Sequence, residues 1–95
     1  MAGYVIADVN VTNAVAYEEY RKLVPASIQK YGGKYLVRSG PHERLEGTWR
    51  PSRLVVIEFA SVEQARRWYL SDEYRRAKEV RQRTALSNVI IVEGV

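Results

Sequence analysis

The sequence has no cysteine, and His42 is its only histidine. The lack of cysteine excludes disulfides, thiolate metal sites, iron–sulfur clusters and cysteine nucleophiles. A single imidazole also excludes iron and zinc sites that need two histidine ligands. We therefore expect no metal and no cofactor, and we expect His42 in an exposed loop. Any chemistry must come from oxygen and nitrogen groups.

Long apolar runs are also missing, and no basic segment followed by an apolar one opens the chain. Neither a membrane span nor an export signal is indicated, so we expect a cytoplasmic protein with no membrane partner. With 95 residues, 46% of them hydrophobic, and a net charge of +4, the composition is typical of one globular domain over residues 1–95.

Strand and helix patterns alternate along the chain. Four segments have the apolar, β-branched composition of strands: 4–11, 34–40, 53–60 and 88–93. Two segments have apolar residues at helical spacing: 17–31 and 61–84. The order strand, helix, strand, strand, helix, strand predicts an α+β, ferredoxin-like fold. Such a fold has one four-stranded antiparallel sheet with both helices on one face.

Capping residues mark the expected helix ends. Thr12 or Asn13 can cap the first helix, and Ser61 begins a Ser-x-x-Gln capping box. Ser71 can cap a further helical turn. Pro25 lies inside the first helical pattern, where its missing N–H predicts a kink or two abutting helical pieces.

The connection from residue 41 to residue 52 is long enough to suggest a function. It contains a possible short strand at 43–46, followed by Gly47, Trp49 and Pro51. Site residues are therefore expected in this connection.

The sheet face away from the helices lacks the polar residues of a solvated face. In the first strand Tyr4 and Ile6 alternate with Val5 and Ala7, and the third and fourth strands are apolar on both faces as well. A contiguous apolar face usually marks an interface, so the sequence predicts a homodimer paired sheet face to sheet face. A monomer with a merely β-rich exposed face is the alternative.

Five motifs spread over nearly the whole chain carry a resemblance to a known family. They are Tyr31-Gly32-Gly33, Arg38-x-Gly40, Leu45-Glu46-Gly47-x-Trp49-x-Pro51-x-Arg53, Glu58-Phe59 and Trp68-Tyr69-x-Ser71-x-x-Tyr74. Together they resemble the small bacterial family called domain of unknown function thirteen-thirty. The chain departs from the usual pattern at Ser39, where a second glycine is common. His42 is outside the motif, which argues against a histidine-centred mechanism.

The resemblance implies the dimeric α+β-barrel superfamily. Its relatives include cofactor-independent antibiotic-biosynthesis monooxygenases and muconolactone isomerases. Longer chains of the superfamily include haem-dependent chlorite dismutases and dye peroxidases. The family itself implies no settled activity.

Asp8, Arg38 and Glu58 each interrupt an apolar strand, and their strands are neighbours or near neighbours in a ferredoxin-like sheet. We expect the three charges to converge, because an unpaired buried charge is costly. In a binding site, Arg38 would hold an anionic substrate while Glu58 or Asp8 moves a proton. The same charges would equally form a structural ion-pair network.

Further candidates lie in the long connection and on the helices. Glu46 is a candidate acid or base, Trp49 would roof a cavity, and Arg53 lies beside them. Packing of Trp49 on a partner subunit is the alternative. On the helices, four tyrosines are expected to face the sheet with hydroxyls available to a ligand: Tyr17, Tyr20, Tyr69 and Tyr74.

The basic second helical region, residues 61–84, raises the question of nucleic-acid binding, since RNA-recognition folds share this element order. That fold carries aromatic residues on its third strand. Here Leu54 to Ile57 are aliphatic, and Phe59 at the strand's end is the only ring. We therefore predict no nucleic-acid partner.

These observations predict a protein that binds a small anionic or aromatic metabolite. One hypothesis is transformation without a cofactor, as by a monooxygenase or an isomerase, and the alternative is a non-catalytic ligand-binding or regulatory homodimer. The predicted catalytic residues are Arg38, Glu46 and Glu58. The predicted substrate-binding residues are Asp8, Tyr20, Trp49, Arg53 and Tyr74.

Overall fold

Four strands and three helices follow one another in the computed structural model, which describes residues 1–95. In chain order they are β1 (Gly3–Val11), α1 (Ala14–Lys30), β2 (Lys34–Arg38), β3 (Leu54–Phe59), α2 (Val62–Tyr69), α3 (Asp72–Thr84) and β4 (Ala85–Glu93). The expected element order is confirmed, with the second helical region divided into α2 and α3.

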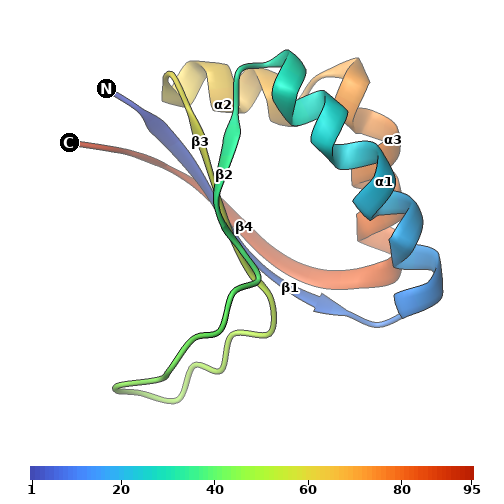
Figure 1. Ribbon diagram of the computed structural model, residues 1–95, viewed down its shortest axis with the longest axis vertical. Helices are drawn as coiled ribbons and strands as arrows, with labels where there is room; N and C mark the ends of the chain where they lie inside the picture. Colours follow the sequence, from blue (N-terminus) through green and yellow to red (C-terminus); the bar gives the residue numbers. More distant parts are fainter.

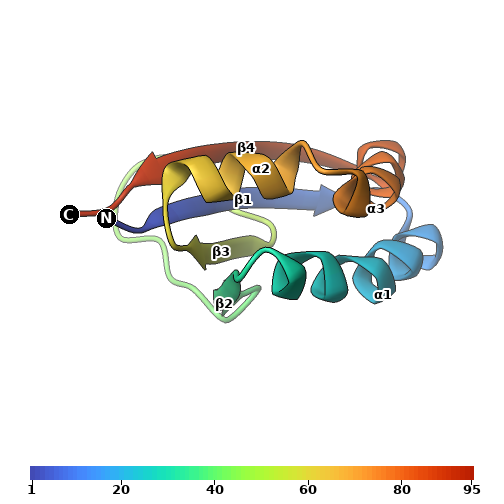
Figure 2. The ribbon, with the colours of Figure 1, turned by 90° about the horizontal axis from the view of Figure 1, so that it is seen from above.

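The strands form one antiparallel sheet in the order β2-β3-β1-β4. All three helices lie on the same side of it (Figure 1). Seen from above, α1 lies on the β2 side and α2 over β1 and β4 (Figure 2). This arrangement confirms the ferredoxin-like α+β fold.

Each helix begins at a polar cap, as the sequence predicts. The Asn13 side chain accepts a hydrogen bond from the Ala16 amide at 3.1 Å, so Asn13 rather than Thr12 is the cap of α1. Ser61 and Ser71 accept bonds from amides three residues later, at 3.0 and 3.1 Å. These bonds satisfy amides that would otherwise have no helical partner.

Of the two outcomes expected at Pro25, two abutting helical pieces is wrong, because α1 runs through this residue as one helix; a kink stays a prediction. Val24 and Ile28 on its buried face are each only 2% exposed. Their burial against the core holds the helix together despite one missing backbone donor, since packing supplies most helical stability in proteins.

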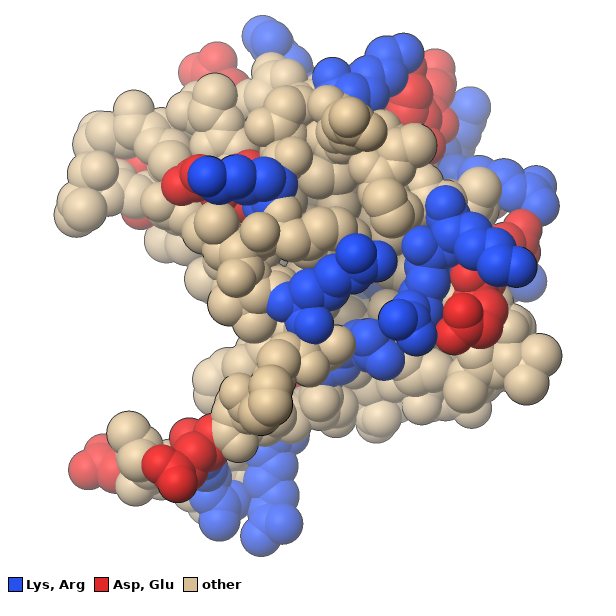
Figure 3. Space-filling model, in the orientation of Figure 1, with Lys and Arg blue, Asp and Glu red and all other residues tan.

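Residues 39–53 contain no strand, so the short strand expected at 43–46 is absent. A lone strand without a neighbour to complete its hydrogen bonds is not stable. We call residues 39–53 the arm, because the segment projects from the sheet on the side away from the helices (Figure 1). A hollow separates the arm from the end of the sheet that carries both termini (Figure 3).

Strand limits also differ from the expected ones. β2 ends at Arg38 rather than Gly40, since Ser39 takes a left-handed backbone conformation with φ of 53°. β4 begins at Ala85, three residues before Asn88, because β1 pairs with it from Gly3 to Val11. The longer β1–β4 pair extends the sheet under the C-terminal end of α3.

The core lies between the sheet and the helices. Its largest fully buried side chains are Phe59, Trp68 and Tyr74. The Trp68 ring lies 4.1 Å from the Tyr74 ring and 5.4 Å from that of Phe59, measured between centroids. The opposite face stays open: Leu86 is 69% exposed and Ile90 57%.

None of the three helices combines the length and the apolar character needed to cross a membrane.

Candidate functional site

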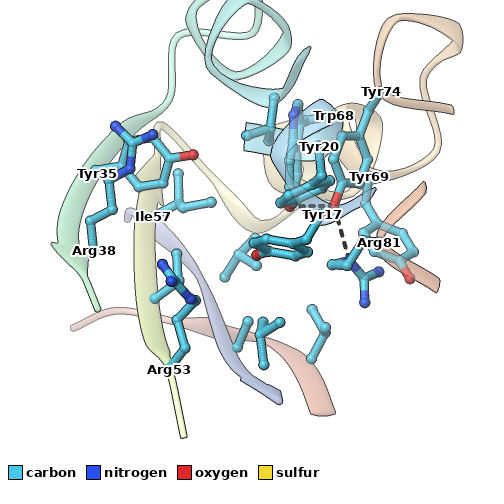
Figure 4. Close-up of a pocket in the computed structure, with 16 residues that line it drawn as sticks. Tyr17, Tyr20, Tyr35, Arg38, Arg53, Ile57, Trp68, Tyr69, Tyr74 and Arg81 are labelled. Carbon is cyan, nitrogen blue, oxygen red and sulfur yellow. Dashed lines mark hydrogen bonds between the residues drawn. The ribbon is translucent and has the colours of Figure 1, made fainter. Parts of the chain in front are cut away.

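A cavity lies between the sheet and the helices, and three arginines line it together with six aromatic side chains (Figure 4). The cavity volume is about 50 Å³. It lies within an atom-free space of about 570 Å³ that includes the open mouth. The lining residues are Val5, Ala7, Val9, Tyr17, Tyr20, Val24, Tyr35, Arg38, Arg53, Val55, Ile57, Trp68, Tyr69, Tyr74, Arg81 and Val89. Such a space suits a small, flat molecule.

Arg81 is the buried charge of this cavity. It lies in the last turn of α3, where the helix dipole favours a cation, and it is 5% exposed. Its Nε donates a long hydrogen bond to the Tyr74 hydroxyl, at 3.4 Å, and the Tyr74 and Tyr20 hydroxyls lie 3.0 Å apart in a second bond. No carboxylate pairs with Arg81. A buried guanidinium without a counter-ion is costly, so this group is ready for an anionic partner.

Arg38 and Arg53 reach the cavity from the other side. The Arg38 guanidinium lies over the Tyr35 ring, 4.6 Å from its centroid, and that of Arg53 lies 5.7 Å from the Tyr17 centroid. Arg53 also donates to the Ser39 hydroxyl at 3.1 Å. Both arginines thus lie against aromatic faces, as cation–π contacts favour.

A β-bulge sets the direction of Arg38. The register of β2 against β3 shifts between Tyr35 and Val37, so that Arg38 pairs with Val55. Val55 belongs to the cavity lining, and Arg38 therefore lies on the face covered by the helices.

The titratable groups of the cavity keep its charge positive at neutral pH. Burial raises the pKa of Tyr20 well above its ordinary value of 10, and burial also raises the pKa of Tyr17 and Tyr35. Burial lowers the pKa of Arg81, but Tyr74 and Tyr20 outweigh it and the net shift is upward. The phenols thus stay neutral donors and Arg81 stays charged.

The cavity brings together some of the residues predicted for the site: Arg38, Arg53, Tyr20 and Tyr74. Figure 4 shows Arg38 and Arg53 on one side, with Tyr20 and Tyr74 across from them. Their proximity fits the predicted binding site, and their roles stay predictions.

The expectation that Asp8, Arg38 and Glu58 converge is wrong. Asp8 and Glu58 alternate along their strands with the cavity-lining residues and lie on the open face, whereas Arg38 lies on the helix side. Glu58 accepts a bond from the Tyr4 hydroxyl at 3.0 Å, and Lys34 Nζ lies 3.7 Å from it. Local partners therefore satisfy this carboxylate.

Asp8 holds the base of the arm. It accepts hydrogen bonds from Trp49 Nε1 at 2.9 Å and from the Ser52 amide at 2.8 Å. The Trp49 bond is the main cause that holds the pKa of Asp8 below its ordinary value. Trp49 is 60% exposed and Glu46 and His42 are also exposed on the arm, so none of them lines the cavity.

Sequence reasoning missed Arg81 and Tyr35 as lining residues, whereas Tyr17 and Tyr69, expected to face the sheet, do line the cavity. Arg81 had a usable signal, because it follows Tyr74 and Ala77 at helical spacing and places a charge on the buried stripe of α3. Tyr35 had none beside Arg38, since regular alternation puts residues three apart on opposite faces and only the bulge brings both to the cavity.

No group of three or more histidine, cysteine, aspartate or glutamate side chains is arranged to hold a metal ion. The lining contains no carboxylate at all. What the arrangement offers is positive charge, hydroxyl donors and apolar walls.

Solved structures with the same fold come from several bacteria. A protein of unknown function from Rhodopseudomonas palustris, RPA0582, superposes with a TM-score of 0.79 at 19% identity, over 99% of this chain and 82% of that one. A dimeric protein of unknown function with a ferredoxin-like fold from Bacteroides fragilis gives 0.64 at 13% identity, over 98% and 96% of the two chains. At such identities the likeness shows the fold alone.

A third structure is SnoaB, a cofactor-independent oxygenase from Streptomyces nogalater. It gives a TM-score of 0.65 at 12% identity, over 99% of this chain and 92% of that one. A comparison with curated proteins finds no match.

The family is settled by the sequence itself. Residues 2–95 match the sequence model of one family, a span that contains every lining residue of the cavity. The chain therefore belongs to the family described as Domain of unknown function (DUF1330).

Proposed function

We propose that this protein binds a small anionic molecule with an apolar or aromatic body in the cavity between sheet and helices. One observation carries the proposal: the lining includes three arginines and no aspartate or glutamate. Guanidinium groups bind carboxylates through paired, charge-assisted hydrogen bonds, and this preference strengthens where water is excluded. The aromatic walls would hold the ligand's body.

A titration with benzoate tests the proposal. By isothermal calorimetry we expect one benzoate site per chain. Arg38→Ala should lower the affinity for benzoate at least about tenfold, which is the effect of roughly one charge-assisted hydrogen bond. Arg75→Ala is the matched control, because Arg75 is an exposed arginine paired with Asp72 at 3.2 Å. No benzoate binding at millimolar concentration would contradict the proposal, and so would equal loss in both variants.

We also propose that the open sheet face pairs with a second copy of the chain. Ile6 lies opposite Val56 on one side and Ile90 on the other, which makes a continuous apolar strip across three strands. Nearby, Val92 is 43% exposed and Leu86 69%. The dimeric protein from Bacteroides fragilis, which has the same fold, supports a homodimer. Native mass spectrometry at micromolar concentration should give twice the 10.9 kDa chain mass, and a monomer would overturn the pairing.

The second candidate function is oxygenation of the bound anion without a cofactor. A carboxylate-free, arginine-lined cavity favours the ionised form of an acidic phenol or enol, and such an electron-rich anion can itself reduce dioxygen. SnoaB, a cofactor-independent oxygenase, has the same fold, so the fold is compatible with this chemistry. An acid–base isomerase is less well supported, because Glu46 and Glu58 lie outside the cavity.

Oxygen uptake separates the two functions. With phenols and quinols that bind, an oxygenase should consume oxygen faster than autoxidation, and Arg38→Ala should slow it. Binding without oxygen uptake would leave a non-catalytic ligand-binding dimer.

A further inference from the structure

We infer that the ligand of this cavity carries two acidic groups, one at each end of a flat apolar body. The inference rests on the proposed function and narrows it to dicarboxylates and similar dianions. It is drawn from the positions of the three arginines, which lie on opposite sides of the cavity rather than together (Figure 4).

The sheet order separates the arginines. Arg38 is the last residue of β2, an edge strand, and Arg53 directly precedes β3, the strand next to it, so both lie in the same half of the sheet. Arg81 lies at the other edge, where it lines a surface hollow with Ala85 and Val89 of β4. Edge strands of a four-stranded sheet lie about 14 Å apart. Since the side chains reach inward, the remaining gap suits a single ring with an acidic group at each end.

The Arg81 end has hydrogen-bond donors to spare. Arg81 Nε donates to Tyr74, and one of the two hydroxyls of Tyr74 and Tyr20 donates to the other. One hydroxyl hydrogen is left over, whichever way that bond runs. The terminal nitrogens of Arg81 donate to no protein group, and a guanidinium has no acceptor. This end therefore fits an acceptor-only group such as a carboxylate.

The opposite end is also rich in donors. Arg38 makes no hydrogen bond to the protein through its guanidinium, and Arg53 makes only the one to Ser39. Both rest on aromatic faces that fix their position without using their N–H groups. A second acidic group would find two guanidinium groups here.

Aromatic rings occupy the space between the two ends. Tyr17, 4% exposed, lies between Arg53 and Tyr20, with its ring centroid 5.2 Å from that of Tyr20. Figure 4 shows the Tyr17 ring in the middle of the cavity, between the flanking arginines. A ligand with an apolar ring would pack against it, whereas a monoanion would leave one charged end of the cavity without a partner.

The test compares three probes by isothermal calorimetry at pH 7, where aromatic carboxylates are ionised. They are benzoate, benzene-1,4-dicarboxylate and benzene-1,2-dicarboxylate. We expect the 1,4-isomer to bind at least tenfold tighter than benzoate. The 1,2-isomer has the same charge with both groups at one end of the ring, so it controls for simple attraction to a basic protein and should bind like benzoate.

Variants at the two ends complete the test. Arg81→Gln and Arg53→Gln should each bring the 1,4-isomer to within about threefold of benzoate. Because Arg81 is buried, Arg53→Gln is the variant that keeps the inference testable if Arg81→Gln does not fold. A circular-dichroism melt checks each variant.

Each outcome decides between the proposals. If benzoate binds and the 1,4-isomer is no tighter, or the 1,2-isomer gains as much, the two-ended ligand is wrong and the anion site stands. If none of the three probes binds at millimolar concentration, the anion site itself is wrong.

Discussion

Two serines whose hydroxyl oxygens are shielded from solvent, Ser27 and Ser87, test how single polar groups contribute to stability. Ser27 Oγ accepts a hydrogen bond from Trp68 Nε1 at 3.1 Å and donates to the Val24 carbonyl at 2.8 Å. Ser87 Oγ, equally shielded, has no partner. Removing the hydrogen-bond partner of a buried donor lowers stability more than removing a polar group that has no partner.

Ser27→Ala should therefore lower the free energy of unfolding by about 1–3 kcal/mol, because it leaves the indole N–H of Trp68 buried and unsatisfied. Urea unfolding followed by circular dichroism measures this. Ser87→Ala is the control and should stay within about 0.5 kcal/mol of the parent protein. Equal losses in both variants would show that side-chain packing, and not the hydrogen bond, sets the cost.

At the residue scale, the sequence predicts side chains whose direction follows a regular period. Tyr20 and Tyr74 were expected in the cavity from helical spacing alone, and they lie there. Successive residues of a strand point to opposite faces of the sheet. The direction of the Asp8 side chain therefore depends on which set of alternate residues in β1 faces the helices. Apolar residues on both faces of β1 made that choice undecidable from the pattern.

At the scale of elements, α1 and α3 are joined by a surface carboxylate. Glu73 accepts hydrogen bonds from Lys30 at 2.7 Å and from the Tyr31 hydroxyl at 2.8 Å. The bond from Lys30, followed by that from Tyr31, lowers the pKa of Glu73 from 4.5 to about 2. A lowered pKa in the folded state means that the charged form stabilises the fold.

The stabilisation by Glu73 should be present above its unfolded-state pKa near 4.5 and disappear as the pH falls through about 2. Glu73→Gln should thus unfold at lower urea than the parent protein at pH 7, and the difference should shrink toward zero near pH 2. Glu79→Gln, an exposed glutamate of α3 without an ion pair, is the control. A difference that persists unchanged at pH 2 would contradict the assignment.

The arm is the element whose anchoring depends most on one residue. Asp8→Ala removes the acceptor for Trp49 Nε1 and the Ser52 amide, so both protons should exchange with solvent at least tenfold faster in NMR experiments. The indole proton of Trp68, bonded to Ser27, is an internal control and should not change. Unchanged exchange at Trp49 would mean that Asp8 does not hold the arm.

At this scale, features set by residues close in the sequence could be predicted, and features set by residues far apart in the sequence could not. Helix starts were predictable because a cap acts within three residues, as at Ser61 and Ser71. The continuity of α1 at Pro25 and the course of the arm were not, because they depend on tertiary packing and on Asp8, 44 residues away from Ser52. Spacing along the chain carries no information on such contacts.

At the scale of the whole molecule, the fold leaves one face with no cover of its own. Helices bury the side of the sheet that holds the cavity, while the arm projects beside the other (Figures 1 and 3). A second copy on this face would bury the apolar strip and would leave both cavities intact, since they open between sheet and helices. Ligand binding and dimer formation should therefore be separable by mutation.

Ile90→Glu tests this separation. It puts a charge at the middle of the apolar strip, where pairing would have to bury it without a partner, so sedimentation at micromolar concentration should show a monomer. Leu70→Glu is the matched control, because Leu70 is 68% exposed on the helix side, against 57% for Ile90, and should leave the dimer unchanged. Both variants should still bind benzoate, because neither residue lines the cavity. If Ile90→Glu stayed dimeric, the dimer would use a different surface. If it lost benzoate binding along with the dimer, the partner subunit would have to complete the cavity.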